Sequence, residues 1–414
     1  MTDIIRAQKG THDILPSEMK LWYKMEENAC RIFSNAGYGE IRTPIFEATE
    51  LFARGVGDTT DIVSKEMYSF KIKERNLTLR PENTAGIVRS FIENGMHRLS
   101  APVKLWYKGP MFRYERPQSG RQRQFHQLGV EIFGIKEPTA DAEVIELALD
   151  YLKSLGLENL SVEINSIGCI NCRNVYKNKL KSVLKPYLDI LCADCKIRYN
   201  NNPLRLLDCK SEKCRDIFEK PEVKNLINGD FICPDCHEHF ETLKSYLDVL
   251  NINYSVNKML VRGLDYYNGT VFEIKSSGLG TQNTICGGGR YDGLMKNLGG
   301  IDTPAAGFAM GMERLYSLMK NLKSDQTEKL NAYIVSDNTA EALKLVKFFR
   351  NNNKSADFDF RGKNFTKQME KAAKTANYAV ILGENEIASD TVSIKNLETS
   401  EQINVKREDV LNYI

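Results

Sequence analysis

Strand-forming segments occur in two blocks of this chain, and a long stretch of different character separates them. In the first block the strand signals, with turn residues between them, lie at residues 41–46, 67–79, 104–107 and 128–133. Strand and glycine signals return at 260–308, whereas helical segments rich in Lys and Asn dominate at about 167–256. We therefore expect an α+β domain over residues 1–325, an antiparallel sheet flanked by helices, interrupted at 168–255 by a helical insertion domain.

Helical periodicity and a change in composition complete the predicted organisation. Apolar residues at helical spacing predict a helix at 17–36 and another at 140–155, the second ended by Gly156. The polar stretch 323–328 is typical of a linker. After it strands and helices alternate, which predicts a small α/β domain over 329–414, with elements at residues 332–335, 340–349, 365–376 and 378–382.

Composition and charge narrow the function classes. No apolar run approaches the roughly 20 residues that cross a bilayer, and the first residues lack the pattern of a signal peptide, so we expect no membrane association and a cytoplasmic location. The net charge of +3 neither requires nor excludes a nucleic-acid partner. Local clustering of cations matters more, and four arginines lie within eleven positions at residues 113–123.

Eight of the ten cysteines lie between Cys169 and Cys236. Without a secretion signal, such clustering favours metal ligation or reduced thiols over disulfides. One pair, Cys169-x₂-Cys172, is followed after 19 residues by Cys192-x₂-Cys195, a spacing typical of a four-thiolate zinc site. The remaining four repeat that arrangement, with His237 adjacent: Cys209-x₄-Cys214 and, after 18 residues, Cys233-x₂-Cys236. Structural Zn²⁺ and a loosely packed group of reduced thiols are both open interpretations, and neither takes part in catalysis.

The common nucleotide-binding loops are missing, so a nucleotide would need other contacts. The chain has no G-x-x-x-x-G-K-[ST] loop and no G-x-G-x-x-G after a strand. Instead Arg113 stands at the exit of a strand–loop–strand unit, where its guanidinium can meet a phosphate with two hydrogen bonds. A second candidate, Arg314, lies where a strand is predicted to run into a helix. Each alone is more often a solvated surface cation, but the two in this order are far more specific.

The two arginine segments resemble motifs 2 and 3 of the class II aminoacyl-tRNA synthetases, and GYGEIRTP at 37–44 resembles motif 1. Two further segments resemble the histidine signatures of the histidyl-tRNA synthetase family: VRGLDYY at 261–267 and CGGGRYDG at 286–293. The segments TLRPENTA at 78–85 and RQFHQLG at 123–129 extend the match. The resemblance runs from Lys9 into the C-terminal domain, essentially the whole chain.

The resemblance implies a histidine–tRNA ligase, which activates L-histidine with ATP to histidyl-adenylate and pyrophosphate and then transfers histidine to the 3′ end of tRNA(His). Glu131 matches the acid that reads the imidazole, with the hydroxyl of Tyr267 as its expected partner. The α-ammonium group would be accepted by Glu82, Thr84 and Gln127. Tyr266 completes the expected histidine-binding set. A site built on hydrogen bonds rejects analogues that lack the polar atoms by about 10⁴-fold or more, so no editing domain is needed.

For the activation step the resemblance implies a set of cations and no side-chain nucleophile. Arg113 and Arg314 would hold the α- and γ-phosphates, and Arg262 would lie against the α-phosphate in place of a metal ion. Glu115 and Arg121, with Arg123, would reach the base and the outer phosphates, which Mg²⁺ would bridge. Catalysis would then be mainly positioning and electrostatic stabilisation.

The resemblance also implies partners for other parts of the chain. The predicted helix at 17–36 and motif 1 would form a homodimer contact. The insertion would lean on the tRNA acceptor arm. The C-terminal domain would bind the anticodon through basic and aromatic residues, of which we single out Arg361, Lys363, Phe365 and Lys367. Asn83 stands where the family more often has glycine, and its tolerance of left-handed backbone predicts altered loop detail and retained activity.

Simpler interpretations compete with these. Glu131 alone is compatible with a satisfied strand carboxylate, Tyr266 and Tyr267 with core residues, and the glycines at 287–289 with a tight bend. Two rival functions are a catalytically silent paralogue that senses histidine in biosynthetic regulation, and a module that only binds RNA or zinc. Against both stands the joint presence of Glu82, Arg113, Gln127, Glu131, Arg262, Tyr267 and Arg314.

Overall fold

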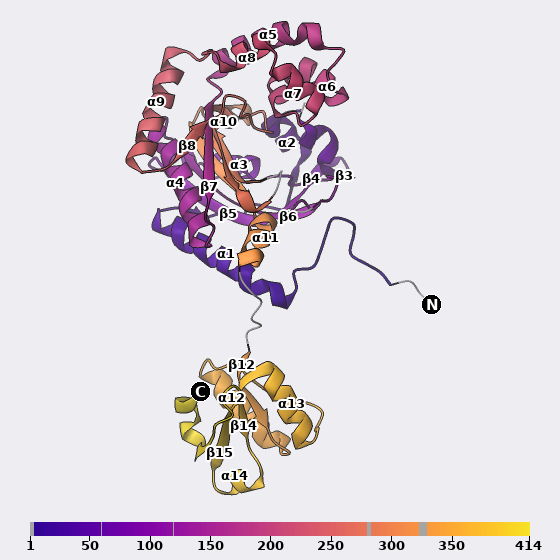
Figure 1. Cartoon of the computed structure of the whole chain (residues 1–414), viewed down its shortest axis with the longest axis vertical. Helices are drawn as coiled ribbons and strands as arrows, with labels where there is room; N and C mark the ends of the chain where they lie inside the picture. The colour runs from indigo at the N-terminus through magenta and orange to yellow at the C-terminus, as the bar shows by residue number, and fades with distance from the viewer. Residues whose placement is uncertain (1–3, 59, 119, 280–282, 323–328) are drawn as a thin grey trace. The chain divides into compact units, whose positions relative to one another are not determined.

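The computed structural model describes residues 4–58, 60–118, 120–279, 283–322 and 329–414 (Figure 1). The chain divides into two compact units, Met1–Ser324 and Asp325–Ile414. The predicted linker at 323–328 falls outside the described residues. Among the described residues, no helix is long and apolar enough to cross a membrane.

An eight-stranded sheet forms the centre of the first unit. Its spatial order is β1-β5-β6-β11-β10-β9-β7-β8, and only the pairs β1/β5 and β7/β8, at the two edges, are parallel. The two blocks of strands seen in the sequence meet where β11 pairs with β6. This confirms the predicted mixed α+β fold with a mostly antiparallel sheet. The strands are β1 (Gly39–Glu40), β5 (Val103–Phe112), β6 (Gln124–Phe133), β7 (Leu160–Ser166), β8 (Tyr254–Val256), β9 (Asn268–Ser276), β10 (Thr284–Arg290) and β11 (Ala305–Gly311).

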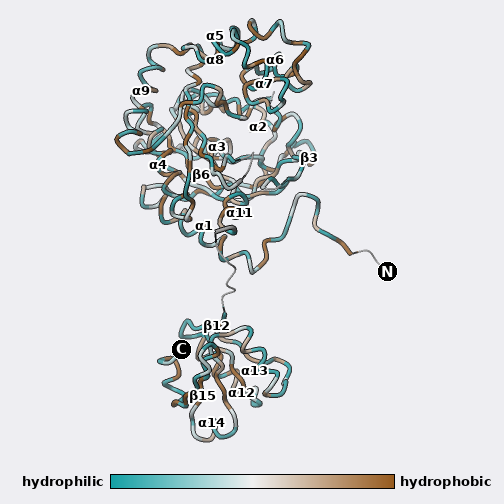
Figure 2. The backbone as a smooth tube through the Cα atoms, viewed as in Figure 1, coloured by the Kyte–Doolittle hydropathy of each residue, from teal (hydrophilic) through white to brown (hydrophobic). Residues whose placement is uncertain are grey.

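Helices α1 (Pro16–Asn35), α4 (Pro138–Ser154) and α11 (Met312–Leu322) cover one face of this sheet. Each of the first two begins with a proline, which suits the first helical turn because its missing N–H would have no partner there. In α1, Trp22, Met25, Ala29 and Phe33 are buried at helical spacing, so the predicted amphipathic face is the one that packs against the sheet. In Figure 2, brown hydrophobic and teal hydrophilic residues alternate along the helices.

A small sheet of β2 (Phe46–Ala48), β4 (Arg75–Leu79) and β3 (Tyr68–Ile72) stands beside α2 (Thr49–Val56) and α3 (Thr84–Glu93). The strand predicted at 41–46 is wrong, because most of that segment belongs to no strand. Its carbonyl groups are used elsewhere: the Arg80 side chain donates to Thr43 O at 2.9 Å and the Arg80 backbone N–H to Ile45 O at 2.9 Å. A buried guanidinium needs such acceptors, so the segment cannot join a regular ladder.

The cysteine-rich segment is helical, with α5 (Ile170–Leu184), α6 (Ala193–Asn201), α7 (Glu212–Phe218), α8 (Pro221–Asn228) and α9 (Pro234–Val249). A 3₁₀ segment, Pro203–Asp208, lies between α6 and α7. Helix α9 packs on α4 and contributes Phe240, Leu243 and Leu247 to the core under that helix. The helices that form a separate layer in Figure 1 are therefore α5 to α8.

The second unit is the α/β domain predicted from the alternating pattern. Its five-stranded sheet has the order β13-β12-β14-β15-β16, parallel over the first three strands and antiparallel over the rest. Asn338 and Asn364 each cap a helix by accepting a backbone N–H. The elements are β12 (Leu330–Val335), α12 (Thr339–Asn351), β13 (Ala356–Phe358), α13 (Phe365–Thr375), β14 (Ala376–Ile381), α14 (Glu384–Ala388), β15 (Thr391–Asn396) and β16 (Gln402–Lys406).

Candidate active site

A cavity of about 950 Å³ opens between the central sheet and the insertion helices. Strands β6, β10 and β11 and the start of α11 supply one wall, and residues of α6 and of the loops around α7 supply the other. Six of the residues predicted to bind histidine or ATP line it: Arg113, Glu115, Arg121, Gln127, Arg262 and Arg314. The remaining predicted residues, Glu82, Thr84, Glu131, Tyr266 and Tyr267, are buried.

Glu131 lies at the centre of the buried group, on β6, with 1% of its surface exposed. Its carboxylate accepts hydrogen bonds from the hydroxyls of Thr84 at 2.8 Å and Tyr291 at 2.5 Å. Burial raises the pKa of Glu131 to about 8, although both hydroxyls oppose the shift. The site thus holds an acceptor whose charge depends on what occupies its surroundings.

Two hydroxyls hold the Glu131 carboxylate, and neither was expected in that role. Within the described residues these belong to Thr84 and Tyr291, while Tyr267, expected to read the imidazole together with Glu131, packs against Tyr266 with ring centroids 4.7 Å apart. Tyr291 lies inside the second signature segment, at 286–293. Its hydrogen bond to Glu131 depends on where β10 lies in the sheet, and the sequence motif does not predict that position.

Glu82 occupies the N-terminus of α3. Its carboxylate accepts the backbone N–H groups of Thr84 at 2.8 Å and Ala85 at 3.0 Å, and the hydroxyl of Tyr266 at 3.5 Å. Burial raises its pKa, while those N–H groups favour the charged form. Nearby on β6, the side-chain oxygen of Gln127 is buried and has no hydrogen-bond partner in the described part of the chain. An unpaired buried acceptor is costly, which makes Gln127 a candidate to receive a ligand N–H group.

Arg262 lies between the buried tyrosines and the cavity. Its guanidinium stands 5.8 Å from the ring of Tyr267 and is ion-paired with Glu273 on β9, which also accepts the hydroxyl of Thr284 at 2.8 Å. The space it occupies exists because residue 287 is glycine: a Cβ there would lie 2.0 Å from Nη2 of Arg262. Glu273 lies outside the recognisable motifs, so the sequence does not predict its role.

The residues of the strand–loop–strand unit form a second cationic group. Arg113 donates to Pro81 O at 2.8 Å and stands over the ring of Phe125 at 5.2 Å. Glu115 contacts Arg113 at 3.8 Å and Arg121 at 3.3 Å, so this acid links the two arginines. Because both arginines also line the cavity, an anion there would compete with Glu115 for them.

Arg314, at the start of α11, donates to Thr284 O at 2.6 Å and to Gly120 O at 3.4 Å. Burial and the nearby charge of Arg121 lower the pKa of Arg314, although the carboxylates of Glu115 and Glu273 act in the opposite direction. The preceding residue, Glu313, accepts the backbone N–H of His126 at 2.9 Å and contacts its ring nitrogen Nδ1 at 2.9 Å. That contact ties α11 to β6 directly beside the cavity.

Asn83 has a φ of −115°, so the left-handed conformation considered for it is not used. Its side-chain oxygen accepts the Thr43 hydroxyl at 2.6 Å and an N–H of Arg80 at 3.3 Å. This asparagine therefore joins the loop before α3 to the segment after β1. Its role in the structure is to hold the loop that carries Glu82.

The cysteines group differently from the sequence prediction. One group contains Cys169, Cys172, Cys233 and Cys236, and the other Cys192, Cys195, Cys209 and Cys214. The predicted grouping by consecutive pairs was wrong, because helices α5 and α9 begin side by side and enclose the segment between them. His237 lies next to the first group in sequence, and its ring faces Asp230 at 3.9 Å and Glu241 at 4.0 Å.

Comparison with known proteins gives one consistent answer. The family model described as "Histidyl-tRNA synthetase" matches residues 10–172 and 231–315. The chain is 46% identical to the histidine–tRNA ligase of Desulforamulus reducens over 413 residues, covering 98% of each chain. This chain belongs to the histidyl-tRNA synthetase family. A second member, the histidine–tRNA ligase of Halothermothrix orenii, is 48% identical over 411 residues, which is 97% of this chain and 96% of that one.

Structural comparison places the whole chain in the same family fold. The crystal structure of apo S. aureus histidyl-tRNA synthetase superimposes with a TM-score of 0.81 at 35% identity, covering 99% of each chain. The second unit matches the model "Anticodon binding domain" over residues 327–414. Residues 173–230, which hold α5 to α8 apart from the start of α5, lie between the two matched segments of the synthetase model.

Proposed function

We propose that this chain activates L-histidine with ATP, forming histidyl-adenylate and pyrophosphate, and then transfers histidine to the 3′ end of tRNA(His). One observation carries the proposal: buried acceptors suited to histidine adjoin a cavity lined by three arginines suited to a triphosphate. The acceptors are Glu82, Gln127 and Glu131, and the arginines are Arg113, Arg262 and Arg314. Family membership supplies the reaction, and the geometry supports the assignment of roles.

Histidine would enter with its imidazole toward Glu131 and its α-ammonium toward Glu82 and Gln127. The imidazole carries an N–H that a carboxylate accepts, and Glu131 is the most buried of the three acceptors. Tyr291 and Thr84 hold that carboxylate in place through their hydroxyls. Tyr266 and Tyr267 form the apolar wall against which the ring packs. Leucine or another apolar analogue would leave these acceptors unpaired and be rejected.

ATP would lie across the cavity wall formed by β6, β10 and β11. Arg113 binds the α-phosphate, Arg314 the γ-phosphate, and Glu115 and Arg121 contact the base and outer phosphates. Arg262 lies against the α-phosphate, where negative charge increases as the histidine carboxylate attacks and pyrophosphate leaves. Mg²⁺ bound together with ATP would offset the charge of the leaving pyrophosphate. We assign the eight clustered cysteines no part in this chemistry.

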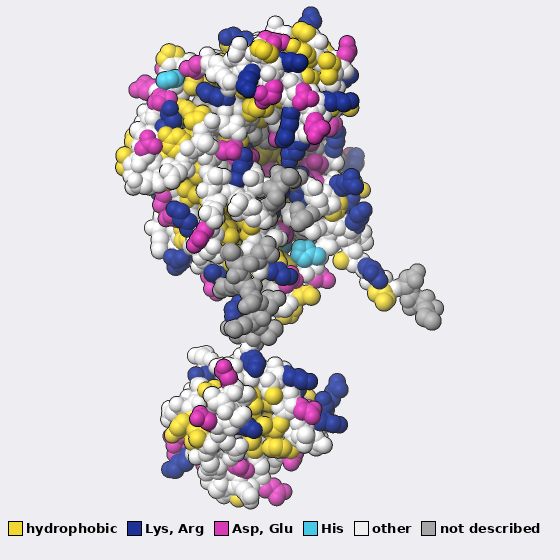
Figure 3. Space-filling model, in the orientation of Figure 1, with side chains coloured by type: hydrophobic (Ala, Val, Ile, Leu, Met, Phe, Trp, Pro, Cys, Tyr) yellow, Lys and Arg dark blue, Asp and Glu magenta, His cyan; other side chains and the backbone are white. Residues whose placement is uncertain are grey.

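The tRNA would use both units of the chain. We propose that the insertion at 168–255 contacts the acceptor arm, and that the unit at 329–414 reads the anticodon. In the second unit, Lys and Arg side chains gather on the side of α13 (Figure 3). Phe365 and Phe360 are 46% and 72% exposed, which offers flat surfaces for unstacked bases beside Arg361, Lys363 and Lys367.

We further propose that the enzyme is a homodimer joined through the motif 1 region. Four large apolar side chains are exposed on or beside the small sheet that follows motif 1: Ile45, Phe46, Phe70 and Ile72, at 44%, 55%, 40% and 54%. Contiguous exposure of this kind marks an interaction surface. A Phe70→Glu, Ile72→Glu variant should sediment as a monomer, whereas Lys71→Glu, a charge change at the exposed residue between them, should leave the dimer intact.

The test of the activation chemistry is histidine-dependent exchange between ATP and pyrophosphate. Arg262→Ala should reduce the exchange rate by about 10²-fold or more, because removing one preorganised charge at a reacting centre costs roughly that much. Arg98→Ala, an exposed arginine of the same unit, should keep the wild-type rate. Folded wild-type protein that binds histidine and catalyses no exchange would overturn the proposal and favour a regulatory role.

A further inference from the structure

The eight clustered cysteines form two compact sulfur groups that the proposed reaction does not use. We call Cys169, Cys172, Cys233 and Cys236 the outer cluster, and Cys192, Cys195, Cys209 and Cys214 the inner cluster. Within each cluster the four sulfur atoms lie within 4.8 Å of one another. The inner cluster falls between the two halves of the outer one along the chain, so the two are nested.

Distances between sulfur atoms match a single tetrahedral ion. With Zn–S bonds of about 2.3 Å, a tetrahedron of four sulfurs has edges of about 3.8 Å. The observed separations are 3.5 Å between Cys169 and Cys172 and 3.8 Å between Cys192 and Cys209. All eight are free thiols. A four-iron cluster carries its cysteines on separate iron atoms and so needs a wider ring of sulfurs.

Backbone geometry supports the sulfur groups independently of their spacing. Cys169, Cys192 and Cys233 each occupy the N-cap of a helix, where the helix dipole favours a thiolate. Three backbone N–H groups donate to sulfurs of the opposite pair: Cys169 to Cys236 at 3.3 Å, Cys233 to Cys172 at 3.1 Å and Cys192 to Cys214 at 3.4 Å. Each of these bonds joins two halves of one cluster, so the backbone itself sets the nested pairing.

Residues on or next to the cysteine-bearing helices form hydrogen bonds with the loop that carries Arg262. After α6, Arg205 donates to Gly263 O at 2.7 Å, and Asn202 donates to the carboxylate of Asp265. From α5, Arg173 donates to Asp265 O at 3.3 Å. Arg173 follows Cys172 of the outer cluster, and Asn202 and Arg205 lie between Cys195 and Cys209 of the inner cluster. Segments anchored by both clusters therefore hold residues 263–265, directly after Arg262.

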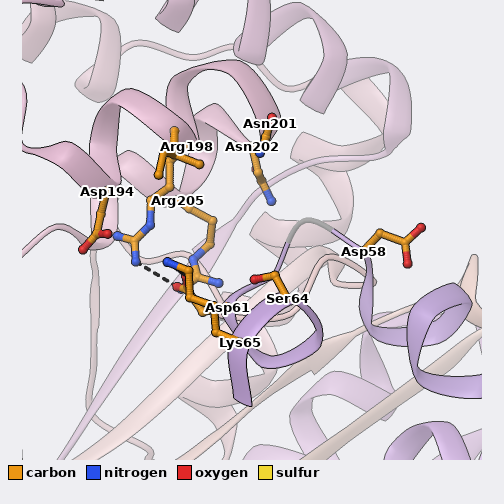
Figure 4. Close-up of a pocket in the computed structure, with 10 residues that line it drawn as sticks. Asp58, Asp61, Ser64, Lys65, Asp194, Arg198, Asn201, Asn202 and Arg205 are labelled. Carbon is orange, nitrogen blue, oxygen red and sulfur yellow. Dashed lines mark hydrogen bonds and ion pairs between the residues drawn. The ribbon is translucent and has the colours of Figure 1, made fainter. Parts of the chain in front are cut away.

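Residues of α6 and the 3₁₀ segment, which carry or adjoin inner-cluster cysteines, also contact Asp61. Arg198 contacts the Asp61 carboxylate at 3.0 Å and Arg205 contacts it at 3.5 Å. Figure 4 shows these side chains converging from α6 and the following turn onto the segment after α2. Cys192 and Cys209 themselves line the active-site cavity, so the inner cluster is part of its wall.

We propose that each cluster binds one Zn²⁺ through four thiolates, and that the inner site, through Asn202 and Arg205, fixes the 263–265 loop so that Arg262 faces the nucleotide. The zinc ions are structural, and Asn202 and Arg205 are positioning residues. Only the second half of this proposal rests on the proposed function, because metal binding is measured without the reaction.

Metal content and pairing are tested on the full-length chain purified from zinc-supplemented cells. Elemental analysis should give two zinc ions per wild-type chain and per Cys30→Ser chain, since Cys30 lies outside both clusters. Cys172→Ser with Cys236→Ser removes two ligands of the outer cluster and should leave one ion. Cys172→Ser with Cys195→Ser damages both nested clusters and should leave none, whereas pairing by consecutive motifs would leave one. Cobalt substitution should produce the absorption of a tetrahedral thiolate site.

Zinc content well below one ion per chain in folded wild-type protein, with all eight thiols open to a thiol reagent, would overturn metal binding. One ion in the Cys172→Ser, Cys195→Ser variant would overturn the nested pairing. Circular dichroism on each variant identifies loss of fold. If one double variant fails to fold, the wild-type stoichiometry and cobalt spectrum still decide metal binding, and the other double variant decides the pairing, because Cys172→Ser with Cys236→Ser would leave no ion under consecutive pairing.

The positioning role is tested by separating histidine binding from the exchange reaction. Arg205→Gln should lower the exchange rate about 10-fold while histidine affinity stays within about twofold, because a small misplacement of a reacting group reduces rate strongly. Arg205→Lys, which keeps the charge, should recover part of the loss. Arg215→Gln, at an exposed arginine of α7, is the matched control and should match wild type.

Equal losses of histidine binding and exchange in Arg205→Gln would mean general disruption and would overturn the positioning role. An unchanged rate would do the same. If wild-type protein shows no exchange at all, the proposed function fails while the metal stoichiometry remains decisive for the clusters.

Discussion

At the scale of single residues, the candidate site is a set of buried charged groups, each held by a partner from another element. Glu131 bonds Thr84 and Tyr291, and Arg262 pairs with Glu273. The positions of Glu131 and Arg262 were predicted because they stand in recognisable segments. The partners Tyr291 and Glu273 were not, because which hydroxyl or carboxylate faces a buried group depends on strand register, and register is a tertiary property.

Glu131 should make the stability of the unliganded protein depend on pH. Its folded pKa, about 8, lies above the roughly 4.3 of an unfolded glutamate, so the native state retains a proton that the unfolded state releases. The stabilisation is complete below the unfolded pKa and is lost as pH rises through the folded pKa. From pH 5 to 8, wild type should lose on the order of 3–4 kcal/mol of unfolding free energy relative to Glu131→Gln.

Denaturant unfolding followed by tryptophan fluorescence measures this difference. Trp22 and Trp106 are the only tryptophans of the sequence, and both belong to the first unit, so the signal reports that unit alone. Parallel pH profiles of wild type and Glu131→Gln would show that Glu131 does not carry the raised pKa.

Gly287→Ala should displace Arg262 without unfolding the sheet. The added methyl group would stand 2.0 Å from Nη2 of Arg262, and the flexible guanidinium would move before the backbone does. We expect the exchange rate to fall at least about 10-fold with histidine affinity largely kept. Gly293→Ala, in the same signature segment, meets nothing within 4 Å and should behave as wild type. Equal activity of the two variants would refute this account of Gly287.

At the scale of helices and strands, local pattern predicted most elements and missed what depends on distant partners. Helix α1 could be predicted from its apolar spacing and from Gly37 after it, both of which are visible in the sequence. In the structure Gly37 has a φ of 83°, a conformation that glycine adopts readily. The strand predicted at 41–46 fails because Arg80, far along the chain, takes the carbonyl groups of that segment. The predicted grouping of the cysteines is wrong for a similar reason. The spacing of cysteines gives their separation along the chain, but it does not show which helices begin side by side.

One buried ion pair joins three elements under the main sheet. Asp141 on α4 contacts Arg290 on β10 at 2.5 Å and His239 on α9 at 3.2 Å, and it is 1% exposed. Burial opposes the charge of Asp141, but Arg290 and His239 together hold its pKa below the usual value. Because the folded pKa is depressed, this contribution is present at neutral pH and is lost only as pH falls below about 4.

Asp141→Asn should lower the unfolding free energy of the first unit by about 3 kcal/mol, because it leaves the buried Arg290 without its counter-charge. The measurement is urea unfolding at pH 7 with tryptophan fluorescence. Asp150→Asn, at an exposed position of the same helix, should change it by less than about 0.5 kcal/mol. Similar effects of the two substitutions would mean that the ion pair contributes little.

At the scale of the whole molecule, each of the two units has its own apolar core. The second unit buries Ile334, Phe349 and Val380 among others, all from its own elements. Composition and alternation of elements were enough to predict this unit as α/β. Its surface function was predictable only through resemblance, because exposed Lys, Arg and Phe have many ordinary explanations.

Ending the chain before Asp325 should separate the two half-reactions. The remaining unit keeps the cavity and all the proposed contacts to histidine and ATP, so exchange should stay within about threefold of the full chain. Charging of tRNA(His) should fall by about 10²-fold or more, since binding energy from remote contacts supports the transfer step. Loss of exchange in a folded truncated chain would contradict the independence of the first unit.

The nested cysteine clusters affect which parts of this chain can change in length during evolution. Because Cys172 and Cys233 belong to one sulfur group, the two ends of the segment between them lie next to each other. The two family-matched segments stop at 172 and resume at 231, at or close to those two ends. A change in length between them would leave the strand order of the sheet intact, but it would have to keep Asn202 and Arg205, which hold the loop after Arg262.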